Sequence, residues 1–168
     1  MPVWGYFVIG FVILSLVLLT ARRNQVAYRD TAVDYGADFR AVIESAIPAV
    51  DEIQEALREG EPQALGRASA SARTRIHANI SNLDRLGIPD EIDGEMRALL
   101  GSLRSMLREA MECYEWAARI SETTDLLENQ GLRRAFETLV ASGDQLCVEA
   151  RLQLVGLQPA VAQTTSEA

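Results

Sequence analysis

The chain contains an uncharged apolar run at residues 3–20. As a helix this run would span about 27 Å, close to the roughly 30 Å hydrocarbon core of a bilayer. Trp4 and Tyr6 lie at one end, where aromatic rings favour the membrane interface, and Arg22 and Arg23 end the run at the other. We therefore expect a retained transmembrane anchor. The alternative is a cleaved signal peptide. Such a peptide has a basic leader before the apolar run and small residues at its cleavage site, and neither feature is evident here.

The rest of the chain is polar and acidic. The whole sequence holds 24 Asp and Glu against 16 basic residues, with a formal net charge of −8. Nucleic-acid binding needs clustered positive charge, so we expect no nucleic-acid partner. All the basic residues are Arg, a bias typical of GC-rich bacterial genomes. Without Lys the chain has no phosphate-loop lysine and no Schiff-base lysine.

Apolar residues after the anchor recur at steps of three and four, which is the helical period, and no long stretch alternates as a strand does. The pattern predicts helical segments at about 24–58, 62–86, 90–127 and 132–157. The breakers between them are Glu59 to Pro62, Gly87 to Asp90, and Asn129 to Gly131, with Thr123 to Asp125 as a rival for the last turn. Short connections make consecutive helices antiparallel neighbours.

The predicted fold class is therefore all-α: a single N-terminal transmembrane helix followed by an antiparallel, up-down-up-down four-helix bundle. We expect the anchor over residues 1–21, the bundle domain over 22–158 and a flexible tail over 159–168. The residues expected to face the core in the first segment are Gly36, Phe39, Ile43, Ala46, Val50, Ile53 and Leu57, and in the second segment Leu65, Ala68, Ala72, Ile76, Asn79 and Leu83. In the third segment they are Leu99, Leu103, Met106, Ala110, Cys113, Ala117, Ile120, Thr124 and Leu127. In the fourth segment they are Phe136, Val140, Gly143, Cys147, Ala150 and Leu154.

The third segment is about a dozen residues longer than the second, so the last two helices could project as a hairpin. Tyr114, Trp116 and Phe136 would then be only partly covered and would form a partner-docking tip. In the alternative, the first helix kinks at Pro48 and covers these three rings.

The two cysteines, Cys113 and Cys147, are equidistant from residue 130 and lie on the predicted apolar stripes. A turn at residue 130 would bring them to one level of the hairpin. They are either a disulfide, which requires an oxidising compartment, or a pair of buried free thiols.

The arginines near the anchor indicate topology. Arg22, Arg23 and Arg29 follow the apolar run and no basic side chain precedes it. The positive-inside tendency favours the bundle on the cytoplasmic face of the inner, cytoplasmic membrane, crossed once. A disulfide would instead favour the periplasmic face.

The remaining polar residues predict no catalytic site. His77 is the only histidine, and we expect an ordinary surface or interface residue. Three glutamates recur at steps of three along one helix: Glu109, Glu112 and Glu115. We expect them to form a solvated face and to pair with Arg104 and Arg108.

The cysteine and histidine spacings fit no standard zinc site, and a di-iron bundle would need two Glu-x-x-His pairs. We expect no metal, no cofactor and no small-molecule substrate. The acidic residues 51–61 read as a charged helix end.

The leading functional hypothesis is a non-enzymatic accessory subunit of a larger bacterial integral-membrane complex, respiratory or photosynthetic among others. Its partners would be integral-membrane subunits and lipid, and Gly10, one turn from Tyr6, could let another membrane helix approach. The alternative is a membrane-anchored sensory or signalling module that acts through a partner.

Overall fold

The computed structural model describes residues 35–88, 92 and 94–157. In these residues the chain forms four α-helices and one short 3-10 helix, and no strand. The first helix covers residues 35–59 and is called the 35–59 helix below. It is followed by α2 (Pro62–Arg85), α3 (Gly94–Ser121), the 3-10 helix η1 (Thr124–Leu127) and α4 (Gln130–Leu157).

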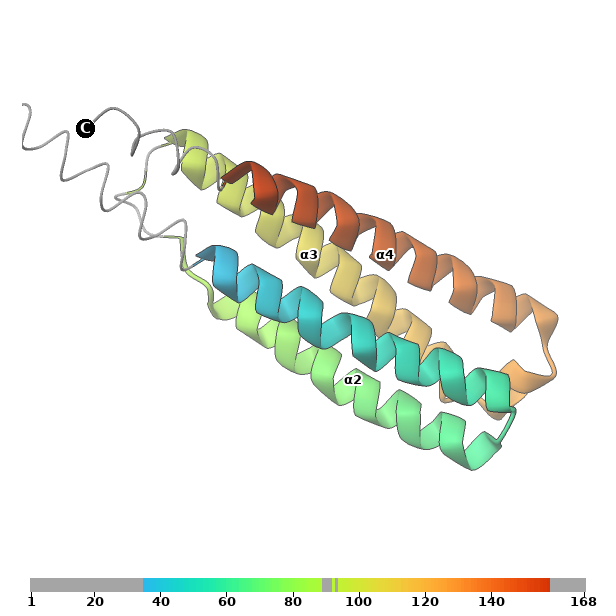
Figure 1. Cartoon of the computed structure of the whole chain (residues 1–168). Helices are drawn as coiled ribbons and strands as arrows, with labels where there is room; N and C mark the ends of the chain where they lie inside the picture. Colours follow the sequence, from blue (N-terminus) through green and yellow to red (C-terminus); the bar gives the residue numbers. More distant parts are fainter. Residues whose placement is uncertain (1–34, 89–91, 93, 158–168) are drawn as a thin grey trace, which may run out of the picture. The chain divides into compact units, whose positions relative to one another are not determined.

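Consecutive helices run antiparallel and lie side by side in one bundle (Figure 1). α3 packs against both α2 and α4. The 35–59 helix contacts α2, because the amide of Asn79 bonds the carbonyl oxygen of Val42 at 3.4 Å. It also shares a surface cleft with α4, lined by Leu57 and Phe136. The predicted up-down-up-down four-helix bundle is confirmed for the described residues.

From Gly36 onward, the described helices belong to one compact unit. No helix of the described part is long and apolar enough to cross a membrane. The predicted anchor over residues 1–21, with Trp4, Tyr6 and Gly10, lies outside the described residues, as does the tail over 159–168.

Turn residues set the ends of these helices. Gly60 ends the first helix with a φ of 72°, in the left-handed region that glycine tolerates. Pro62 begins α2, at a position where the backbone N–H that proline lacks would have no helical partner. Asn129 caps α4: its Oδ1 accepts from the backbone N–H of Gly131 at 2.9 Å and of Leu132 at 3.2 Å.

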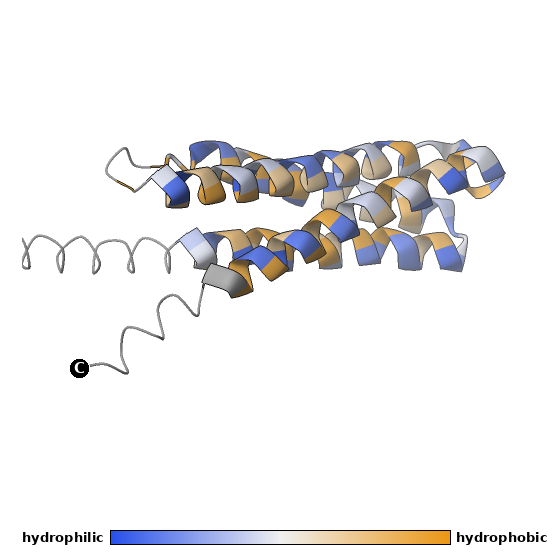
Figure 2. Cartoon of the chain, turned by 90° about the horizontal axis from the view of Figure 1, so that it is seen from above, coloured by the Kyte–Doolittle hydropathy of each residue, from blue (hydrophilic) through white to orange (hydrophobic). Residues whose placement is uncertain are grey.

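Hydropathy alternates along every helix, as expected where one face packs into a core (Figure 2). The predicted stripes of the 35–59 helix and of α4 are buried throughout. The 35–59 helix continues through the exposed Pro48, and the kink proposed there stays a prediction.

The expectation that the third helix runs unbroken through residues 121–124 is wrong. α3 ends at Ser121. The hydroxyl of Ser121 donates to the carbonyl of Ala118 at 2.8 Å, and this carbonyl still accepts from the backbone N–H of Glu122. The carbonyl of Ile120 accepts from the hydroxyl of Thr123 at 2.6 Å and from its backbone N–H at 3.1 Å, which replaces the bond that a continuing helix would make there. α3 therefore has 28 residues against 24 in α2, and α4 also has 28, so the difference is smaller than expected.

Candidate functional site

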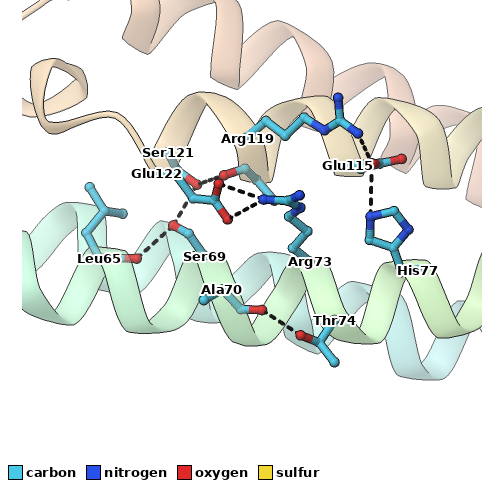
Figure 3. A network of polar contacts seen from close by, with 11 residues as sticks. Leu65, Ser69, Ala70, Arg73, Thr74, His77, Glu115, Arg119, Ser121 and Glu122 are labelled. Carbon is cyan, nitrogen blue, oxygen red and sulfur yellow. Dashed lines mark hydrogen bonds and ion pairs between the residues drawn. The ribbon is translucent and has the colours of Figure 1, made fainter.

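Polar contacts between α2 and α3 form the network drawn in Figure 3. Its buried part is Ser69 and Ser121, whose hydroxyl oxygens lie 2.7 Å apart. Each hydroxyl also lies within bonding distance of a carbonyl of its own helix, Leu65 for Ser69 and Ala118 for Ser121. The two hydroxyl protons are thus shared among three short contacts: the one between the serines and the two to carbonyls. The serine pair joins α2 to α3 inside the bundle.

The same network continues to the surface through charged groups. The guanidinium of Arg73 bonds both carboxylate oxygens of Glu122, at 2.9 and 3.1 Å. His77 Nε2 lies 3.1 Å from Oε1 of Glu115, and Arg119 donates to the same oxygen at 2.5 Å. Arg119 also lies over the ring of Trp116, with its guanidinium carbon 5.0 Å from the ring centroid.

These contacts correct one prediction and confirm another. Glu115 is not part of a solvated face, because its side chain is only 14 % exposed and faces α2. His77, predicted to be an ordinary surface or interface residue, is half-exposed at the α2–α3 contact. Arg108 bonds Glu112 as expected, at 3.2 Å, whereas Arg104 donates to the carbonyl of Leu86.

A second cluster joins α3 to α4 around Tyr114. The ring of this tyrosine is fully buried, and its hydroxyl donates to Oδ1 of Asp144 at 2.6 Å. The Cys147 sulfur lies 3.7 Å from the same hydroxyl oxygen. Burial, followed by the bond to Asp144, raises the pKa of Tyr114 well above its ordinary value. Tyr114 is therefore a neutral donor at physiological pH, and its hydroxyl joins α3 to α4.

Both cysteines are free thiols. Of the two alternatives that the sequence left open, a disulfide or a pair of buried free thiols, the second is therefore correct only in part. Cys147 is buried, but Cys113 is half-buried. Burial raises the pKa of both thiols, and Glu109 and Glu112 raise that of Cys113 further. A thiol with a raised pKa is a poor nucleophile at neutral pH.

The aromatic docking tip predicted at Tyr114, Trp116 and Phe136 does not form. Tyr114 and Phe136 are buried in the core, and Trp116 alone is exposed, at 56 %. The prediction failed because it placed the end of the third helix too late, and a projecting hairpin was needed to uncover these rings.

In the described part of the chain, three of the four exposed large apolar side chains lie on α4 instead. Val148, Leu152 and Val155 are 53, 68 and 61 % exposed. They follow one another at steps of four and three, so they share one face of the helix, and we call them the α4 ridge. They lie beside the single stripe that the sequence pattern predicts for this helix, although their own spacing was a readable signal.

No cluster of three or more His, Cys, Asp or Glu in the described part of the chain is placed to hold a metal ion. Within the acidic stretch 51–61, Glu52 pairs with Arg75 at 2.9 Å and Glu55 with Arg58 at 2.8 Å. These pairs are exposed, and such contacts contribute little to stability.

Comparison with protein-family models, curated proteins and solved structures found no match for this chain.

Proposed function

We propose that this protein is a non-enzymatic, membrane-tethered bundle that docks through the α4 ridge onto a helix of an integral-membrane partner. Residues 3–20 would be the tether, and the chain would act as an accessory subunit of a larger bacterial membrane complex. Its mechanism would be positional, because a tether and a docking face together hold neighbouring subunits in register.

The observation that supports this proposal most directly is the position of the α4 ridge in the bundle. The C-terminal part of α4 and the first residues of the 35–59 helix are at the same end of the bundle (Figure 1). The ridge occupies the last turns of α4, and the apolar run precedes the 35–59 helix in the chain. A tethered bundle would thus present its exposed apolar side chains near the membrane, where a helix of a membrane protein can extend beyond the lipid.

The chemistry of the described bundle supports a structural role. Tyr114, Ser69 and Ser121 use their hydroxyl groups to join helices. The two thiols have raised pKa values and are not activated. The free thiols, with Arg22, Arg23 and Arg29, favour the cytoplasmic side of the inner membrane.

Co-purification from native membranes in a mild detergent tests the proposal. We expect a stoichiometric integral-membrane partner with the full chain, and its loss with Leu152→Glu, because a buried unpaired carboxylate disfavours the contact. Ser142→Glu adds the same charge to an exposed position of α4 outside the ridge and should keep the partner. A chain that purifies alone, or a partner retained by Leu152→Glu, contradicts the proposal.

A further inference from the structure

A cleft of about 480 Å³ lies between the 35–59 helix and α2. Four of its lining residues, Asp38, Ala41, Val42 and Ser45, follow one face of the first helix. The rest come from the last turns of α2 and the residue after it: Asn79, Asn82, Arg85 and Leu86. The volume is within the range of about 300–1,000 Å³ that is typical of small-molecule sites.

The floor of the cleft includes a polar side chain in a core position. Asn79 continues the buried stripe of α2 and is only 5 % exposed. Its Nδ2 makes two long contacts, 3.4 Å to the carbonyl oxygen of Val42 and 4.0 Å to the sulfur of Met111. Burying a weakly bonded amide is costly, and a polar ligand in the cleft would offset that cost.

The two walls carry opposite charges. Asp38 lies on the first helix and Arg85 on α2, and both are exposed. Neither forms an ion pair with another residue of the described bundle, unlike Arg73, Arg75 and Arg108. An isolated acid and an isolated base on facing walls suit a ligand that itself carries both charges.

We propose that this cleft binds a zwitterion of the α-amino-acid type with an aliphatic side chain. Its ammonium group bonds Asp38 and its carboxylate bonds Arg85, while the Asn79 and Asn82 amides and the Ser45 hydroxyl satisfy the remaining donors and acceptors. The aliphatic side chain packs on Ala41, Val42 and Leu86. The site adds ligand binding to the docking role, and it clamps two helices of the bundle together.

Calorimetric titration of the full chain in mild detergent tests the site with valine, leucine, isoleucine and methionine in turn. We expect at least one of them to bind and to raise the unfolding temperature, since a ligand of the folded state stabilises it. Two analogues of leucine dissect the charges: 4-methylpentanoate lacks the ammonium group and 3-methylbutylamine lacks the carboxylate. Each should bind at least about tenfold more weakly than leucine, the loss expected for one charge-assisted bond.

Two variants locate the site. Asp38→Asn and Arg85→Gln each remove one wall charge at an exposed position, so folding should be retained, and each should weaken binding at least about tenfold. Asp51→Asn and Arg67→Gln make the same changes at exposed positions of the same two helices outside the cleft and should bind as the unmodified chain does. If none of the four amino acids binds, or if binding survives either cleft substitution, the proposal is wrong.

Discussion

The contact between Tyr114 and Gly143 shows how one residue sets the distance between two helices. A methyl group added at Gly143 would lie 2.5 Å from Cε1 of Tyr114 and 2.8 Å from its Cδ1. The ring cannot move aside easily, because it is buried and its hydroxyl is bonded to Asp144. Glycine at 143 is therefore required by the close approach of α3 and α4, and the backbone conformation there is ordinary helix.

Gly143→Ala should lower the free energy of unfolding by about 1–2 kcal/mol, because overpacking outweighs the gain in helix propensity of about 1 kcal/mol. Gly66→Ala is the matched control, since nothing lies within 4 Å of a methyl group at this helical glycine. It should raise the free energy of unfolding by about 0.5–1 kcal/mol. Urea unfolding of the full chain in mild detergent measures both, and a stabilising Gly143→Ala would show that the contact is not tight.

The raised pKa of Tyr114 predicts a loss of stability in alkali. Its pKa is higher in the folded chain than the ordinary value of 10.0. Above about pH 10 the unfolded chain therefore loses a proton that the folded chain keeps, and the free energy of unfolding falls by up to about 1.4 kcal/mol per pH unit from this group. Below pH 10 the contribution is fully present.

Tyr114→Phe should remove this part of the slope. It should also cost about 1–2 kcal/mol at neutral pH, because the bond to Asp144 is lost. Unfolding measured from pH 8 to 11 compares the two chains. Equal slopes above about pH 10 would mean that Tyr114 titrates normally.

At the scale of the element, the buried Ser69–Ser121 pair fixes how α2 lies against α3. We expect Ser69→Ala and Ser121→Ala each to cost about 1 kcal/mol, since either change leaves the other hydroxyl bonded to its own helix carbonyl. The double variant should cost about 0.5–1 kcal/mol less than the sum, because both changes remove the same interhelical bond. The control pair is Thr74→Ala and Thr138→Ala, which remove exposed hydroxyls that bond only their own helix. The free-energy changes of these two substitutions should be additive. Strict additivity of the serine pair would argue against a shared bond.

The sequence predicted two core faces completely and two in part, since on α2 the predicted Ala68 is half-buried and Ser69 is buried instead. All the residues predicted to face the core on the 35–59 helix and on α4 are buried. α3 packs against both α2 and α4 and has apolar side chains on adjacent columns of its surface. Its core face includes Met96 and also Leu100, Leu107 and Tyr114. The last three each come one position after a predicted residue, Leu99, Met106 or Cys113, that is only half-buried. Periodicity alone cannot choose between neighbouring columns that are both apolar.

The candidate sites were harder to predict than the fold. Asn79 and Asp38 were visible in the sequence, but only the packing of α2 on the 35–59 helix places them in one cleft. The spacing of Val148, Leu152 and Val155 places them on one face of α4, but only the structure shows that the bundle leaves this face exposed. Helix pairing is a long-range property that no local pattern contains.

At the scale of the whole molecule, the side of the membrane is testable through Cys113, which is half-buried and free. We expect a membrane-impermeant maleimide to leave the chain unlabelled in intact cells and to label Cys113 once the inner membrane is permeabilised, slowly because its pKa is raised. Cys113→Ala supplies the control, because Cys147 is buried and should not react. Labelling in intact cells would place the bundle on the periplasmic side.

The central claim is that a tethered bundle meets its partner through the α4 ridge. Photo-crosslinking in native membranes tests it most directly, with a benzophenone amino acid at position 152 of the full chain and, as a control, at the exposed position 67 of α2. The account predicts one dominant cross-link from position 152 to an integral-membrane protein and none to that protein from position 67. Equal cross-linking from both positions, or none from position 152, would contradict it.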